Sequence, residues 1–142
     1  MSNADSLMAA LAPIFGSGEL DVDDALIDRI GDSLDKISDP EKITGAMTAD
    51  SSFTAEFEGR DGLQATWADW LDTFSRVRLE MEKVEEIGDN VITFVTQTGT
   101  TRHGVDVAQP SAAVWKFRDG KLARVEFHLD PDLARVSARE PV

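Results

Sequence analysis

The stretch from Val77 to Asp130 reads VRLEMEKVEEIGDNVITFVTQTGTTRHGVDVAQPSAAVWKFRDGKLARVEFHLD, and it predicts four strands folded into one curved antiparallel sheet. Short hairpin loops need a residue with positive φ, which glycine supplies most easily. Each predicted turn carries one, at Gly88, Gly104 and Gly120. The last strand has the plainest period of two, since Phe127 and His128 fall on opposite faces. We expect the rest of the chain to pack on this sheet.

The composition argues against several classes of partner. The chain has 142 residues, which favours one domain, and 27 acidic against 14 basic side chains give a net charge of −13. A nucleic acid or an anionic membrane surface would need clustered Lys and Arg, so neither is expected as a partner. The absence of cysteine removes disulfides and thiolate chemistry, and it fits a cytoplasmic protein. Neither a signal peptide nor a membrane-spanning apolar run is predicted.

The first half of the chain carries helical patterns. Residues 7–15 have helical apolar spacing that Pro13 limits, and they predict an N-terminal arm over residues 1–20. This arm is either frayed or a flap that packs over the sheet or a partner subunit. A second amphipathic helix is predicted from Asp21 to Ile37. Asp39 and Pro40 resemble the start of another helix, and a short strand should follow over residues 52–57.

A further helix is predicted after the turn at residues 59–62, with Trp67 and Trp70 on a wide aromatic stripe that needs a large apolar surface. The curved sheet is the one candidate for that surface. Within the sheet, the shift of apolar positions after Lys83 predicts a bulge, and Pro110 predicts an edge or a bulge. The domain should span residues 21–134, followed by a polar, disordered tail over 135–142.

Several segments together resemble the SnoaL-like branch of the nuclear transport factor 2 (NTF2) superfamily, which includes ketosteroid isomerase. They are residues 58–63 with the Trp67/Trp70 helix, the Gly88-Asp89 turn, and the closing strands from Val114 to Asp130. The resemblance covers roughly residues 21–134. It implies an α+β, cone-shaped roll, in which three N-terminal helices pack on a strongly curved antiparallel sheet and enclose a deep apolar pocket. It also implies a homodimer formed through the outer face of the sheet.

The same resemblance argues against ketosteroid isomerase chemistry, which needs a general-base carboxylate together with a tyrosine and a protonated aspartic acid as oxyanion donors. The aspartate position falls on Ala113, the tyrosine position falls near Gly31, and the base position falls near Ala55. The chain contains no tyrosine at all. All three roles are therefore predicted to be vacant.

Another acid/base set is conceivable, because such chemistry needs only a titratable group within reach of the substrate. The candidate catalytic residues are Glu56, His128 and Asp130. The alternative for Glu56 is a solvated carboxylate at a strand end. Strict alternation puts His128 and Asp130 opposite Phe127, on the outer face, where an interface role is the alternative. With two distant histidines and no cysteine, neither a metal site nor a cofactor is predicted.

The predicted pocket has an apolar lining with a few hydroxyls, the usual form of a small-molecule site. Its expected ligand-binding residues are Phe53, Trp67, Thr96, Thr98, Ser111, Trp115, Phe117 and Phe127. The alternative is a filled core, in which the aromatic side chains pack on one another. We favour a protein that binds a small apolar or polycyclic molecule without catalysis. The alternative is a cofactor-independent isomerase, dehydratase or polyketide cyclase.

Overall fold

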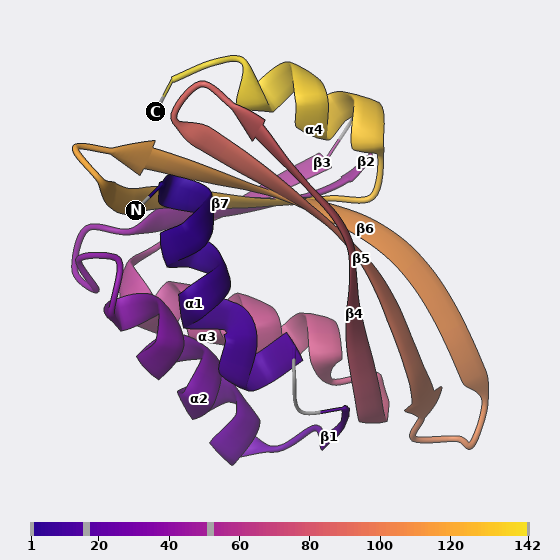
Figure 1. Cartoon of the computed structure of the whole chain (residues 1–142). Coiled ribbons are helices and arrows are strands. Elements are labelled where there is room, and N and C mark those ends of the chain that lie inside the picture. Colours follow the sequence, from indigo (N-terminus) through magenta and orange to yellow (C-terminus); the bar gives the residue numbers. More distant parts are fainter. Residues whose placement is uncertain (1, 16–17, 51–52, 142) are drawn as a thin grey trace.

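The chain folds as helices packed on both sides of one curved sheet, as the computed structural model shows (Figure 1). The structure describes residues 2–15, 18–50 and 53–141, with the backbone alone for residues 48–50 and 53–55. The helices are α1 (Asn3–Phe15), α2 (Asp24–Asp35), α3 (Gly59–Leu71) and α4 (Pro131–Ala138). The strands are β1 (Glu19–Asp21), β2 (Thr44–Asp50), β3 (Phe53–Glu58), β4 (Phe74–Ile87), β5 (Asn90–Thr101), β6 (Asp106–Arg118) and β7 (Lys121–His128).

The predicted meander is confirmed as β4 to β7, which are neighbours in a sheet of order β1-β4-β5-β6-β7-β2-β3. The turn glycines have the expected positive φ, 61° at Gly88, 80° at Gly104 and 79° at Gly120. The predicted bulge is also present, because the β4–β5 register shifts between Met81 and Lys83. Such a bulge bends a strand and increases its twist, which helps the sheet to curl around the core.

The helix predicted after Pro40 is wrong, because this segment forms β2. The Asp39 carboxylate does accept a hydrogen bond from the Glu41 amide (2.9 Å), and the Ile43 amide bonds the Asp39 carbonyl (3.0 Å). After that single turn, however, the chain continues as a strand between β7 and β3. It pairs parallel with β7 and antiparallel with β3. Burial of Ile43 and Ala46 secures the strand there.

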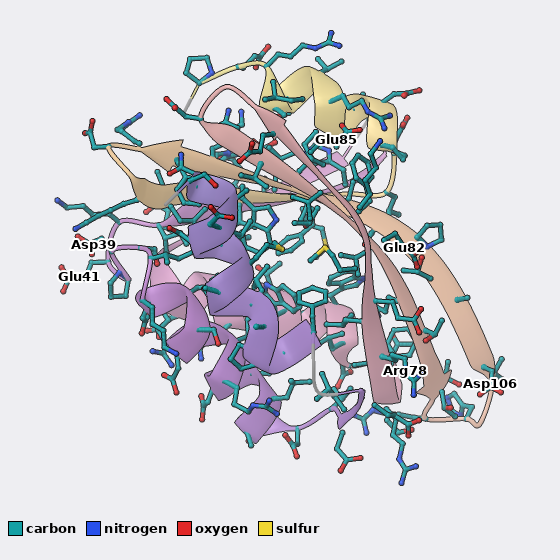
Figure 2. The ribbon with its side chains drawn as sticks, in the orientation of Figure 1. Asp39, Glu41, Arg78, Glu82, Glu85 and Asp106 are labelled. Carbon is teal, nitrogen blue, oxygen red and sulfur yellow. The ribbon has the colours of Figure 1, made fainter. Side chains whose placement is uncertain are left out.

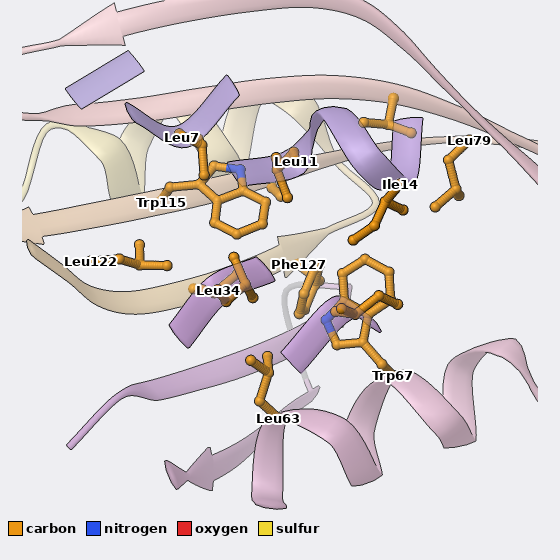
Figure 3. Close-up of a cluster of buried hydrophobic side chains, with 14 of the residues drawn as sticks. Leu7, Leu11, Ile14, Leu34, Leu63, Trp67, Leu79, Trp115, Leu122 and Phe127 are labelled. Carbon is orange, nitrogen blue, oxygen red and sulfur yellow. The ribbon is translucent and has the colours of Figure 1, made fainter. Parts of the chain in front are cut away.

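Helices α1, α2 and α3 cover the concave face of the sheet and close a cone around the core (Figures 1 and 3). Of the two interpretations of residues 7–15, the structure has a packed helix over the sheet, since Leu7, Leu11 and Ile14 are buried in the main core. Charged side chains such as Glu82 and Asp106 lie on the outside (Figure 2). None of the helices in the described residues is long and apolar enough to cross a membrane.

Helix α4 covers part of the outer face, and it corrects the predicted disordered tail. Ala134 and Ala138 are buried against Ile92 and Val114 of the sheet. At the end of the helix, the buried Asn90 amide donates to the carbonyls of Ala138 (3.0 Å) and Glu140 (3.1 Å). Residues 135–138 are therefore an ordered part of the fold.

Candidate functional site

A small apolar cavity lies inside the cone, between α1, α3 and the concave face of the sheet. Its volume is about 20 Å³, which leaves room for about one water molecule. The lining comes from two helices and four strands: Phe15, Trp67, Trp70, Leu79, Thr93, Val95, Ser111, Ala113, Trp115 and Phe127. In this conformation the side chains of the core, aliphatic and aromatic, fill most of the cone.

An aromatic cluster forms one wall of this cavity. The spacing of Trp67 and Trp70 on α3 brings both indoles against Phe127 of β7. The Trp67 and Phe127 rings meet edge to face, with centroids 5.2 Å apart and planes at 87°, and the two indoles lie 5.7 Å apart at 62°. Such edge-to-face contacts add to the stabilisation that burial of the rings provides.

Two indole N–H groups of the lining differ in their partners. The Trp115 Nε1–H donates to the Thr93 hydroxyl, with 2.8 Å between Nε1 and Oγ1, so this donor is satisfied within the wall. The Trp67 Nε1–H is buried and has no hydrogen-bond partner in the described part of the chain. Leaving a buried donor unpaired costs on the order of 1–3 kcal/mol. Trp67 is thus a lining residue whose indole carries a buried donor without a partner.

The three acid/base candidates all lie away from the cavity lining. Glu56 is exposed on β3, where its carboxylate pairs with the Arg124 guanidinium at 3.0 Å. Asp130 is the N-cap of α4 and accepts a hydrogen bond from the Asp132 amide at 2.9 Å. His128 is buried on the outer face, as the strand alternation predicts. Among the described side chains, no carboxylate or imidazole lines the cavity.

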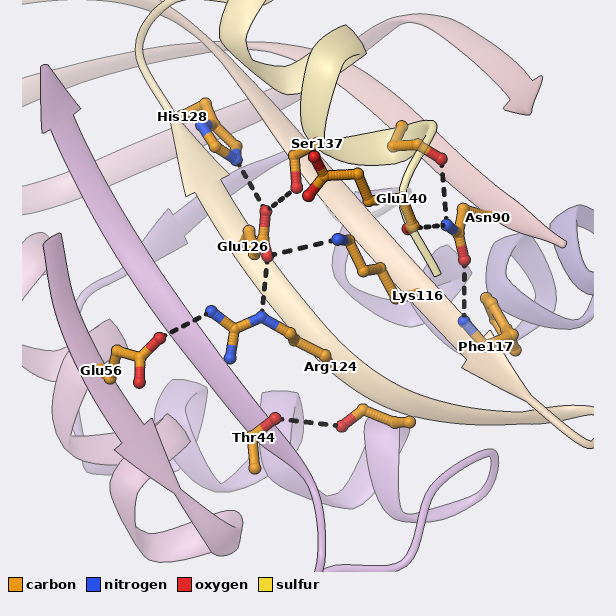
Figure 4. Close-up of polar contacts among 12 residues, drawn as sticks. Thr44, Glu56, Asn90, Lys116, Phe117, Arg124, Glu126, His128, Ser137 and Glu140 are labelled. Carbon is orange, nitrogen blue, oxygen red and sulfur yellow. Dashed lines mark hydrogen bonds and ion pairs between the residues drawn. The ribbon is translucent and has the colours of Figure 1, made fainter. Parts of the chain in front are cut away.

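His128 belongs instead to a buried ionic network on the outer face, centred on Glu126 (Figure 4). The Glu126 carboxylate lies 3.1 Å from His128 Nε2, 2.7 Å from Arg124 Nε and 3.7 Å from Lys116 Nζ, and it accepts a hydrogen bond from the Ser137 hydroxyl of α4. Burial alone would raise the pKa of Glu126, but the hydrogen bonds from His128, Arg124 and Ser137 outweigh it, so this pKa lies well below its usual range.

The network does not have the geometry of a nucleophilic triad. A serine nucleophile needs an imidazole base beside its hydroxyl, and the base is in turn oriented by an acid. Here Ser137 and His128 both contact the same Glu126 oxygen, which lies between them. The arrangement therefore fixes α4 to the sheet. Within the described residues, no cluster of His, Cys, Asp and Glu side chains is arranged to hold a metal ion.

Half of the predicted ligand-binding residues line the cavity: Trp67, Ser111, Trp115 and Phe127. Phe117 is buried in the same core but does not reach the lining. Thr96 and Thr98 lie on the outer face, because they alternate with Val95 and share the face of Ile92 and Phe94, which pack on α4. The side chain of Phe53 lies outside the described residues.

The sequence interpretation missed several lining residues: Phe15, Trp70, Leu79, Thr93, Val95 and Ala113. Trp70 lies on the predicted aromatic stripe of α3, but it is not among the predicted lining residues. The alternation of Thr93 and Val95 with Ile92 and Phe94 along β5 does indicate that Thr93 and Val95 share one face of the sheet. Both faces of this strand are apolar, however, so the pattern alone does not say which face is inside.

The comparison with known sequences and structures agrees with this geometry. The profile of the SnoaL-like domain family matches residues 38–125. The chain belongs to the SnoaL-like family. No curated protein matches it at a significant level.

Solved structures show the same fold. A protein from Jannaschia sp. CCS1 assigned to the SnoaL-like polyketide cyclases is 19% identical, with a TM-score of 0.66 over 97% of this chain and 94% of that chain. An NTF2-like protein of unknown function from Burkholderia pseudomallei K96243 is 18% identical, with a TM-score of 0.67 over 95% and 97%. TerC, co-crystallised with polyporic acid, is 20% identical, with a TM-score of 0.65 over 97% and 98%. This SnoaL-like protein therefore has the NTF2-like α+β cone fold.

Proposed function

We propose that this SnoaL-like protein binds a small apolar molecule that carries a hydrogen-bond acceptor, and that the chain supplies no acid/base step to it. The observation that carries the proposal is the buried, unpaired N–H of Trp67, a residue that lines an apolar cavity. An apolar lining with few polar groups is the common form of small-molecule sites. The co-crystallisation of its structural neighbour TerC with polyporic acid supports a small-molecule ligand for this fold.

The chemistry of the wall limits the ligand class. An indole N–H only donates, so its partner must be an acceptor such as a carbonyl or ether oxygen. The half-buried Ser111 can donate or accept, which adds a second polar contact at the rim. The remaining lining favours an aromatic or polycyclic skeleton through edge-to-face contacts with Trp67 and Phe127.

A matched pair of compounds tests this proposal by isothermal titration calorimetry. 2-Acetylnaphthalene offers a carbonyl oxygen, whereas 2-isopropenylnaphthalene has nearly the same shape without it. We expect the ketone to bind about 2- to 10-fold tighter, the value of one ordinary hydrogen bond. Trp67→Phe should remove this preference, while the control Trp70→Phe should keep it. Absence of binding, or an equal preference in Trp67→Phe, would contradict the proposal.

The alternative of an isomerase, dehydratase or polyketide cyclase has less support. It requires a titratable group near the substrate, and Glu56, His128 and Asp130 all lie outside the lining. If a substrate is identified, single replacements of Glu56 and His128 test these roles directly. Turnover that depends on either residue would favour the enzyme.

A homodimer through the outer face also stays a prediction. Because α4 covers Ile92 and Val114, the outer surface left for a second copy lies over the far ends of β4, β5 and β6, around Thr96 and Thr98. Light scattering coupled to gel filtration would measure the mass. A cytoplasmic location likewise remains a prediction, which fractionation of cells that express the chain would test.

A further inference from the structure

The lining residues of the cavity differ in exposure, and this difference locates its mouth. Seven of the ten are buried in the wall, whereas Phe15, Trp70 and Ser111 are half-buried. These three come from separate elements: Phe15 is the last residue of α1, Trp70 lies in the last turn of α3, and Ser111 belongs to β6. The path from solvent to the cavity therefore passes between the ends of two helices and one strand.

The strand pairing explains why the opening lies there. Strand β7 pairs with β6 only as far as His128 and Ala112. From Ser111 back to Asp106, β6 pairs with β5 alone in the described residues. The wall of the cone thus loses a strand at Ser111, and Phe15 at the end of α1 lines the same cavity.

The body of α1 is firmly attached, but its last side chain is less so. Leu7, Leu11 and Ile14 are buried in the core, and the Arg29 guanidinium donates to the Pro13 carbonyl at 2.7 Å. Lifting the helix would expose all three apolar side chains to water. Turning one half-buried ring about its side-chain bonds exposes far less surface. Phe15 can therefore move more easily than Leu7, Leu11 or Ile14.

We propose that Phe15 is the gate and the size-determining residue of the cavity. Its ring occupies the mouth in this structure, and it turns outward when a ligand larger than one water molecule is admitted. This inference rests on the proposed function, because it assigns the access route and the size limit to that same site. It explains how a 20 Å³ cavity can serve an aromatic ligand.

The test needs no ligand, because all three tryptophans of the chain line this cavity. In a Trp70→Phe background, only the buried Trp67 and Trp115 emit, and acrylamide quenching of their fluorescence reports how easily a small neutral molecule reaches the cavity. We expect Phe15→Ala to raise the quenching constant severalfold and Phe15→Leu to raise it less. Met8→Ala is the matched control, because Met8 packs on the core from the same helix without lining the cavity.

An equal quenching constant in Phe15→Ala and its parent would contradict the assignment of Phe15 as the gate. An equally large rise of the quenching constant in Met8→Ala would contradict it too. Urea unfolding of each variant separates an opened mouth from general loosening. Stopped-flow mixing with 2-acetylnaphthalene adds a second measurement, in which Phe15→Ala should bind faster than its parent. Higher quenching in Phe15→Ala, without binding of any compound, would support the gate and contradict the proposed function. Binding of a compound, with quenching and association rate unchanged in Phe15→Ala, would support the proposed function and contradict the gate.

Discussion

Glu126 is the residue on which the outer face depends. Its carboxylate is buried, and it balances Lys116, whose side chain is only 5% exposed. Taking two charges out of water is costly, so a buried pair contributes little net stability, but removing one partner leaves the other uncompensated. The consequence of a single substitution here should therefore be much larger than at an exposed ion pair.

Replacing Glu126 by Gln should lower the free energy of unfolding by about 3 kcal/mol, because Lys116 then stays buried without a counter-charge. The matched control is Glu56→Gln, which breaks the ion pair between Arg124 and a glutamate side chain that is 68% exposed. That change should cost less than about 1 kcal/mol. Urea unfolding measures both, and similar losses in the two variants would contradict the assigned role of Glu126.

The same carboxylate predicts an acid-dependent loss of stability. The pKa of Glu126 is lowered in the folded chain, so its contribution is fully present above the unfolded pKa of about 4.3. As the pH falls below that value, the unfolded chain takes up a proton that the folded chain does not, and the contribution shrinks. Denaturant unfolding between pH 7 and pH 3 should therefore show wild type losing its advantage over Glu126→Gln. An advantage that is constant over this range would contradict the prediction.

At the scale of elements, Asn90 connects the sheet to the end of α4. Its amide nitrogen donates to the Ala138 and Glu140 carbonyls, and its carbonyl oxygen accepts a hydrogen bond from the Phe117 amide at 3.3 Å. The two carbonyls and the Phe117 amide are buried or partly buried, and each of them loses this hydrogen bond if the Asn90 side chain is removed.

Asn90→Ala should lower the free energy of unfolding by about 2 kcal/mol and speed amide hydrogen exchange most strongly over residues 131–138. The control is Asp89→Ala, in the same turn, because the Asp89 side chain is exposed and Asn3 contacts only its backbone carbonyl. Exchange that rises equally throughout β5 and α4 would show that α4 does not loosen as a separate element.

The elements that the sequence predicts well are those whose contacts are local. The hairpins of β4 to β7 follow from their turn glycines and from alternation, and α2 and α3 follow from their apolar stripes. β2 does not, because its place is set by pairing with β7 about 80 residues later, while Asp39 and Pro40 imitate a helix start. α4 docks through the small side chains of Ala134 and Ala138, which give little hydrophobic signal. Because α4 covers Ile92 and Phe94, the outer face of β5 is apolar as well, and alternation alone does not tell whether Thr96 and Thr98 share a face with the pocket.

At the scale of the whole molecule, the net charge of −13 opposes compaction. The acidic side chains repel one another more strongly when the chain is folded, and salt screens this repulsion because the Debye length falls from about 30 Å at 0.01 M to about 10 Å at 0.1 M. We therefore expect added salt to stabilise the fold at neutral pH.

Raising NaCl from 10 to 150 mM should increase the free energy of unfolding by about 1 kcal/mol, or the Tm by roughly 3–4 °C. Differential scanning calorimetry measures this change, and KCl at equal ionic strength is the control for an ion-specific effect. A falling Tm would mean that ion pairs such as that between Arg60 and Asp32 outweigh the general repulsion.

The strand order has a consequence for how the chain folds during synthesis. Of the strands that the structure describes, β7 is the last to be made, yet it lies inside the sheet, between β6 and β2. While a nascent chain is still on the ribosome, the β2–β3 hairpin has no neighbour on its β7 side until residues 124–128 have emerged from the exit tunnel. The two halves of the sheet therefore stay separate during translation until β7 has left the exit tunnel and pairs with both.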